Sequence, residues 1–119
     1  MEYKRSDRVA DLIQREIADL LLRRVKDPRV SGITLTGVEV TADLQHARVF
    51  YTITTGAATE EKDKEAVALG LVKAKGFMRQ ELGKRLHMRY VPQLNFQYDA
   101  SFEYGDKIER LLKELHKDE

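Results

Sequence analysis

Basic side chains are concentrated in one part of this sequence, between positions 73 and 89. Six residues there are basic and one, Glu81, is acidic, a local balance of 6 − 1 = +5 in a chain whose formal net charge is +1. A charge run is by itself more often a solvated face, but its concentration on an otherwise neutral chain favours binding of nucleic-acid phosphates. The basic residues are Lys73, Lys75, Arg79, Lys84, Arg85 and Arg89.

A helix break or a sharp kink is expected inside this basic segment, at Ala74-Lys75-Gly76. The apolar stripes before and after these residues are out of register, and glycine weakens a helix interior. A helix restarting at such a kink offers unbonded N–H groups beside Lys73, an arrangement that favours a bound phosphate. Helical geometry predicts that Lys75, Arg79 and Lys84 lie near one side.

A second basic group lies in and after the first predicted helix. Its members are Arg5, Arg8, Lys26 and Arg29, and they add to the RNA-binding surface if the fold brings them to the same side.

No catalytic or metal-binding constellation is recognisable. The spacing of His46, His87 and Asp99 forces none of them together with a nucleophile, and we interpret both histidines as surface residues. The chain has three histidines and no cysteine, which is a poor set for zinc. We therefore expect neither an enzyme nor a cofactor.

The first helix and the two strands that follow are well marked. Apolar residues at three- and four-residue steps predict a helix that begins at Ser6 or Asp7 and ends at Asp27-Pro28. Alternating apolar residues then predict two strands joined by a turn at positions 42–45, with a β-bulge at Gly37 where the alternation changes phase. The helical stripe consists of Val9, Leu12, Ile13, Ile17, Leu20, Leu21 and Val25.

The second half of the chain is expected to add helices and one more strand. After a loop at 55–59, a helical segment runs from about Glu60 to Leu86, with Ala66, Leu69 and Val72 as its first stripe. Pro92 opens a third strand, and Gly105-Asp106 starts a last helix. We expect a single α+β domain over residues 1–119, with a three-stranded sheet packed by helices on one face and a charged, frayed tail from about 113.

Composition sets the cellular setting that we expect. The absence of cysteine fits a reducing cytoplasm, and no apolar run is long enough to span a membrane. Nothing in the sequence indicates an obligate dimer, so we expect a monomer.

The order α-β-β-α-kink-α-β resembles a type II KH domain. KH domains clamp a single strand with a Gly-x-x-Gly loop between their central helices. Here Ala74-Lys75-Gly76 stands in its place, which resembles the ribosome-binding factor A family. Further matching segments are Arg8-Val9, Lys26-Asp27-Pro28-Arg29, Asp43-Leu44, Gly76-Phe77-Met78-Arg79 and Arg89-Tyr90-Val91-Pro92-Gln93-Leu94-Asn95-Phe96.

The resemblance implies a role in ribosome biogenesis. It implies that the chain binds the free small (30S) ribosomal subunit and its precursor 16S rRNA, and assists late 30S maturation and rRNA processing at the 5′ end, including adaptation to cold. The alternative from another class is a protein-interaction module whose basic face docks an acidic partner. On the first hypothesis, the kink recognises folded ribosomal RNA by shape and phosphate.

Overall fold

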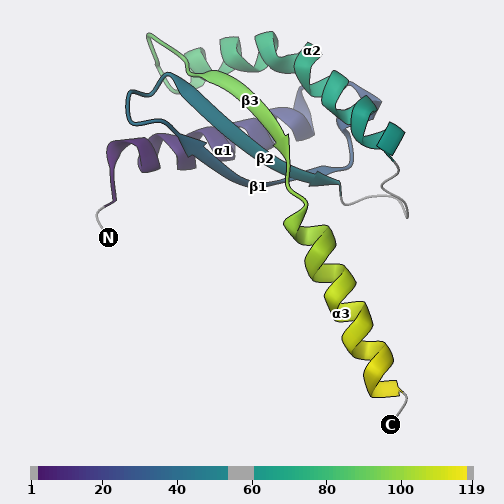
Figure 1. The fold of residues 1–119 in the computed structure, drawn as a ribbon. Helices are drawn as coiled ribbons and strands as arrows, with labels where there is room; N and C mark the ends of the chain where they lie inside the picture. The colour runs from purple at the N-terminus through teal and green to yellow at the C-terminus, as the bar shows by residue number, and fades with distance from the viewer. Residues whose placement is uncertain (1–2, 54–60, 118–119) are drawn as a thin grey trace.

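The computed structural model describes residues 3–53 and 61–117, so the predicted loop at 55–59 lies outside the described residues. Figure 1 shows a sheet with two helices over one face and a third helix leading away from it. This order confirms the expected KH-like α+β fold. In chain order the elements are α1 (Arg5–Arg23), a 3₁₀ turn η1 (Pro28–Val30), β1 (Ile33–Val40), β2 (His46–Ile53), α2 (Glu61–Arg85), β3 (Gln93–Tyr98) and α3 (Ser101–Lys117).

The sheet has the strand order β1-β2-β3. β1 pairs with β2 in antiparallel fashion, and the register shifts between Leu35 and Gly37, which confirms the expected bulge. β2 pairs with β3 in parallel, from His46 opposite Gln93 to Tyr51 opposite Tyr98. Parallel neighbours need a crossover connection, and α2 lies in that connection.

The core lies between the sheet and the helices α1 and α2. In β2, alternate side chains such as Ala47 and Val49 point toward the helices and are fully buried. The helices contribute one apolar stripe each, and burial of these stripes is the main source of stability for both. The buried cluster consists of Ile13, Ile17, Leu20, Ala47, Val49, Met78, Leu82 and Leu94.

α1 begins and ends earlier than the sequence predicted. Lys4 is its N-cap, and the Asp7 carboxylate accepts a hydrogen bond from the Lys4 N–H, so Asp7 caps from the third helical position. The helix ends at Arg23 because Arg24 and Val25 both donate to the Leu20 carbonyl, which closes its last turn before Pro28.

α2 runs without interruption through Ala74-Lys75-Gly76, so the predicted break at this point is wrong, while Figure 1 shows the helix curving along its length. Leu69 and Val72, taken as its inner stripe, are 58% and 61% exposed. The side chains that face the core recur at steps of four, three, four and four residues, which is one continuous helical stripe. They are Val67, Leu71, Ala74, Met78 and Leu82.

The continuous helix leaves no restarted N-terminus, and its N–H groups at positions 74–76 are part of the helix. A single exposed glycine costs about 1 kcal/mol in a helix, which packing of the flanking stripe outweighs. The predicted phosphate site on free N–H groups is therefore wrong as well.

α3 starts at Ser101, before the predicted Gly105-Asp106. The Asp99 carboxylate accepts hydrogen bonds from the Ser101 N–H and hydroxyl, and these bonds cap the helix and lower the pKa of Asp99. α3 extends away from the sheet, and its apolar residues from Ile108 to Leu115 are exposed (Figure 1). Among the described residues, α1 and α2 are therefore the helices that cover the sheet. α3 continues as far as Lys117, through the tail that the sequence predicted to fray.

None of the helices in the described part of the chain is long and apolar enough to cross a bilayer.

Candidate nucleic-acid interface

The helical period of α2 sorts its cations onto different sides. Lys73 and Lys84 are eleven positions apart, about three turns, so they share a side. Lys75 and Lys84 are nine positions apart, about two and a half turns, so they lie on opposite sides. The prediction that Lys75, Arg79 and Lys84 lie together is therefore wrong for Lys84.

The side with Lys73 and Lys84 adjoins α1. Phe77 and Glu81 lie between the two lysines along the same stripe, and both contact Arg24 at the end of α1. The Arg24 guanidinium stacks 5.7 Å from the centre of the Phe77 ring and lies 3.8 Å from the Glu81 carboxylate. Among the residues that the structure describes, neither lysine has a carboxylate within ion-pair distance.

Arg85 faces inward, toward α1. Its guanidinium lies 3.0 Å from Glu16 and 2.7 Å from Asp19, and its side chain is only 26% exposed. The hydrogen bond from Arg85 lowers the pKa of Asp19, helped by Arg23 on the next turn. Arg85 thus neutralises the acids of α1 and joins the two helices, and its charge is already satisfied within the protein.

Arg79 is also engaged by the protein. Its Nε donates to the Pro92 carbonyl at 3.1 Å and its Nη2 to the Val91 carbonyl at 2.9 Å, which fastens α2 to the connection before β3. Lys75 is one turn earlier on this side and is half-buried. The geometry separates Arg79 from the lysines facing α1 and gives it a structural role.

Arg29 is a third arginine that is engaged within the protein, by Asp27. Asp27 accepts hydrogen bonds from the Arg29 N–H and guanidinium, the shortest at 2.6 Å. These bonds lower the pKa of Asp27 from its ordinary 3.8 to about 2. Its neighbour Lys26 is exposed and, with Lys73 and Ala74, lines a shallow hollow between α1 and α2.

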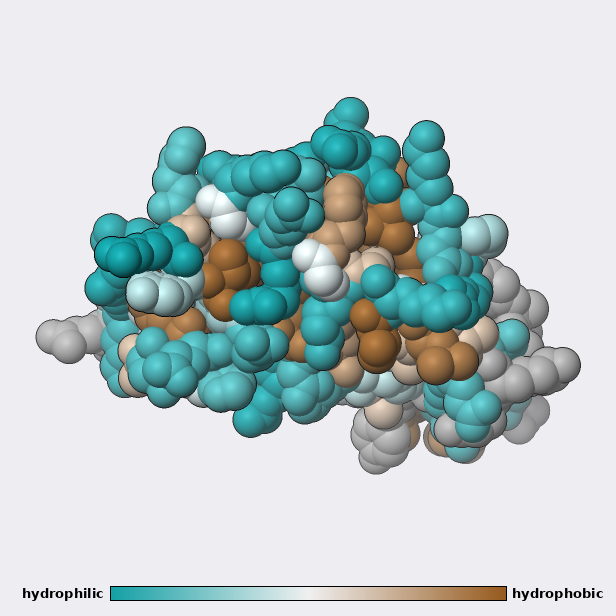
Figure 2. Space-filling model, turned by 90° about the horizontal axis from the view of Figure 1, so that it is seen from above, coloured by the Kyte–Doolittle hydropathy of each residue, from teal (hydrophilic) through white to brown (hydrophobic). Residues whose placement is uncertain are grey.

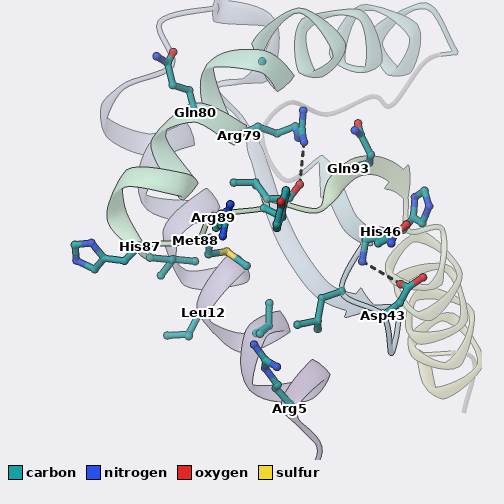
Figure 3. Close-up of a pocket in the computed structure, with 17 residues that line it drawn as sticks. Arg5, Leu12, Asp43, His46, Arg79, Gln80, His87, Met88, Arg89 and Gln93 are labelled. Carbon is teal, nitrogen blue, oxygen red and sulfur yellow. Dashed lines mark hydrogen bonds between the residues drawn. The ribbon is translucent and has the colours of Figure 1, made fainter.

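Arg5 and Arg8 lie on one stripe of α1, together with Leu12 one turn further on. Arg5 and Leu12 line a larger hollow, of about 1070 Å³, at the end of the sheet where the β1–β2 turn lies (Figure 3). Arg79, Gly76 and Arg89 line the same hollow from α2 and from the connection that follows it.

The helical face seen in Figure 2 is mostly hydrophilic, with apolar side chains showing between the charged ones. We define the seam surface as the predicted RNA-binding cations on α1, on the segment directly after it and on α2 that are exposed and make no ion pair within the described residues. The nearby acids Glu16, Asp19 and Glu81 pair with Arg85 and Arg24, which favours a positive surface here although the whole chain is nearly neutral. The seam surface consists of Arg5, Arg8, Lys26, Lys73 and Lys84.

Two residues near the predicted site were missed. Arg24 bridges α1 to α2, and Tyr90 lies on the rim of the larger hollow with 77% of its surface exposed. Tyr90 follows directly on Arg89, and an aromatic residue beside a cation is a pattern typical of single-strand binding, so a signal was present. For Arg24 no local signal existed, because its contacts depend on how the helices cross.

The candidate histidines are placed as expected on the surface. His46 and His87 are exposed, and the described residues contain no group of three or more acidic, histidine or cysteine side chains that could hold a metal ion. Asp99, weighed as a partner for catalysis, caps α3 and accepts a hydrogen bond from Thr36.

Comparison with known proteins gives a consistent result. The model of the family described as "Ribosome-binding factor A" matches residues 5–112. Ribosome-binding factor A of Syntrophobacter fumaroxidans is 72% identical over 119 residues, covering all of both chains. That of Syntrophus aciditrophicus is 52% identical over 118 residues, covering 99% of this chain and 93% of the relative.

Solved structures share the fold. The crystal structure of ribosome-binding factor A from Thermus thermophilus superposes with a TM-score of 0.66 at 22% identity, covering 78% of this chain and 93% of the other. A homology model of the Thermus factor, fitted into a cryo-EM map of its complex with the 30S subunit, superposes with a TM-score of 0.61 at 21% identity. It covers 76% of this chain and 91% of its own. The family match and the full-length identity together show that this chain belongs to the ribosome-binding factor A family.

Proposed function

We propose that this chain binds the free small ribosomal subunit through 16S rRNA and assists late maturation of the subunit, including processing of the precursor 5′ end. It acts in the cytoplasm, as one domain and as a monomer. The observation that carries the proposal is the seam surface, where Lys73 and Lys84 are exposed and, among the described residues, have no carboxylate within ion-pair distance. The family membership supports it, and the Thermus factor has been fitted into a map of its 30S complex.

The chemistry of the seam surface suits folded RNA. Lysines on a rigid helix act as point charges for phosphate oxygens, and such contacts orient a protein on RNA without reading its sequence. Because α2 is uninterrupted, it presents these charges at fixed spacing along one side of a helix, with no loop at Ala74-Lys75-Gly76 to wrap a single strand. The protein therefore fits the shape of a structured RNA surface, and it is a binding factor and not an enzyme.

Co-sedimentation with purified small subunits tests the proposal. We expect the full chain to pellet with free small subunits and to remain in the supernatant once their RNA is digested. The logarithm of Kd should rise linearly with the logarithm of the salt concentration, because each phosphate contact releases counterions.

Two results would overturn this assignment. One is a salt-independent Kd, and the other is retention on ribosomal proteins after nuclease treatment. The latter would favour the alternative, a module that docks an acidic protein partner.

A further inference from the structure

The larger hollow differs in character from the seam surface, although the two share Arg5. It lies at one end of the sheet, between the start of α1, the second half of α2 and the connection 86–92 (Figure 3). At about 1070 Å³ it has ample room for a nucleotide, since pockets for small ligands begin at roughly 300 Å³. Its walls are partly apolar, from Val9, Leu12 and Leu86.

The hollow is electrostatically suited to an anion. Among the described residues, three arginines line it and Asp43 is the one acidic lining residue. The Asp43 carboxylate accepts hydrogen bonds through Oδ1 from the Thr41 hydroxyl and the Gln45 N–H, which hold it in the β1–β2 turn. The positive charges of the lining therefore outnumber its one negative charge, and a phosphate entering the hollow meets Arg5 and Arg89.

Tyr90 stands at the rim, and its exposure does not come from a loose loop. The connection that carries it is fastened on both sides: Arg79 donates to the carbonyls of Val91 and Pro92, and the Met88 N–H donates to the Gly83 carbonyl. The Pro92 side chain is fully buried. A fixed backbone thus holds the Tyr90 ring in solvent. The exposed ring surface is unfavourable in water, and no burial elsewhere on the ring compensates for it.

The ring of Tyr90 already has a cation beside it. The Arg89 guanidinium lies 5.6 Å from the ring centre, within the range of a cation–π contact. An aromatic ring next to an arginine plane is the arrangement on which unpaired RNA bases stack, with the arginine free to reach the phosphate.

The geometry points to a subsite for one unpaired nucleotide in this hollow: the base stacks on Tyr90, and Arg89 and Arg5 hold its phosphates. This inference rests on the proposed function and adds to it, since the seam surface addresses folded RNA and the hollow takes a base displaced from it. Arg79 also lines the hollow, but its guanidinium is engaged by the Val91 and Pro92 carbonyls, so its role is to position the connection. Stacking requires only an aromatic face, so the subsite accepts any base.

The experiment compares Tyr90→Leu with Tyr90→Phe in binding to small subunits. We expect Tyr90→Leu to weaken binding on the order of tenfold, because stacking needs a π face that leucine lacks, and Tyr90→Phe to remain within about twofold. Tyr3→Leu is the matched control, since Tyr3 is also exposed but does not line the hollow. All four proteins are first checked for equal unfolding midpoints.

The salt dependence of binding distinguishes the contact with the base from the contact with the phosphate. Tyr90→Leu should leave the slope of log Kd against log salt unchanged, whereas Arg89→Gln should reduce it by about one, because only the second variant loses a phosphate contact. Ultraviolet crosslinking of the wild-type complex should join RNA to the peptide that contains Tyr90.

The outcomes distinguish this inference from the proposed function. If the wild type binds but Tyr90→Leu and Tyr90→Phe bind equally well, the subsite does not exist and the proposed function stands. A crosslink from Tyr90 to a ribosomal protein would also overturn the subsite, in favour of a protein contact. If the wild type does not bind small subunits, the proposed function itself fails.

Discussion

The inner margin and the outer surface of α2 carry similar residues with different tasks. On the inner margin, Arg79 and Arg85 end on carbonyl or carboxylate oxygens of the protein. On the outer surface, Lys73 and Lys84 end in solvent. The difference follows from their chemistry, because a planar guanidinium satisfies several fixed acceptors at once and an ammonium stays strongly hydrated. On these two sides of α2, then, Arg79 and Arg85 hold the fold together, whereas Lys73 and Lys84 reach solvent, where the proposed function places RNA.

Reversing the outer charges should give the largest effect. We expect Lys73→Glu with Lys84→Glu to weaken binding to small subunits on the order of a hundredfold at physiological salt, because two attractions to phosphate become repulsions. Unfolding by urea should change little, since neither lysine has a carboxylate within ion-pair distance among the described residues, and the attraction of Lys73 to Asp27 is the smallest contribution to the lowered pKa of Asp27.

Lys107→Glu with Lys113→Glu is the matched control, because it makes the same change in net charge on α3. Equal weakening by both pairs would show that overall charge, and not the seam surface, governs binding.

Removing an inner arginine should instead reduce stability. Arg79→Met leaves the Val91 and Pro92 carbonyls without their donor, and we expect it to lower the free energy of unfolding by about 2 kcal/mol, as for a hydrogen bond from a charged group. Lys75→Met, one turn away, should change stability by less than about 0.5 kcal/mol. Urea titrations followed by circular dichroism measure both values, and similar losses would contradict the structural role of Arg79.

Two of the three glycines of α2, Gly70 and Gly76, extend the comparison to the backbone. A β-carbon at Gly70 would lie 2.8 Å from a Val30 methyl carbon and 3.3 Å from an Asp27 carboxylate oxygen, whereas at Gly76 it would meet nothing within 4 Å. We expect Gly70→Ala to destabilise the protein by about 1 kcal/mol through overpacking. Gly76→Ala should stabilise it by roughly 0.5–1 kcal/mol through helix propensity. Thermal unfolding would show Tm shifts of opposite sign, and a loss at Gly76 would indicate that the helix bends there.

The smallest effect concerns the pair beside Gly70. Arg29 holds the pKa of Asp27 at about 2, below the ordinary 3.8, so the charged carboxylate stabilises the folded state. That contribution is complete above about pH 4 and is lost as the pH falls from about 4 to about 2. The free energy of unfolding of the wild type should therefore exceed that of Asp27→Asn at pH 7, and this difference should narrow as the pH falls from about 4 to about 2. A difference that does not change with pH would show that the pKa of Asp27 does not contribute to stability.

Much of the fold was predictable because it depends on local periodicity. The alternation of apolar residues located β1 and β2, and its change of phase placed the bulge at Gly37. α2 was misjudged because Leu69 and Val72 are apolar yet exposed, and including them created a false shift of register at Gly76. Since exposed apolar residues are common, a stripe chosen from residue type alone can miss the true inner face.

The site was harder to predict than the fold. The sequence analysis assigned phosphate contact to every cation of the basic segment, Arg79 and Arg85 included. Arg85 is satisfied by Glu16, 69 positions away, and Arg79 by carbonyls 12 and 13 positions away. Contacts at such separations depend on how helices cross and where a connection passes, which local patterns do not encode.

The parallel pairing of β2 with β3 has a consequence for how the chain folds. His46 pairs with Gln93, 93 − 46 = 47 positions later, whereas β1 and β2 are joined by a short turn. The hairpin can therefore form within microseconds, while β3 must wait until the chain between has collapsed, and sequence-distant pairing of this kind slows folding. On a translating ribosome the hairpin and α1 emerge first, and the sheet closes only after the connection held by Arg79 has been synthesised. The strand made last thus completes both the core and one wall of the larger hollow, so the nascent chain acquires the proposed subsite only once β3 has joined the sheet.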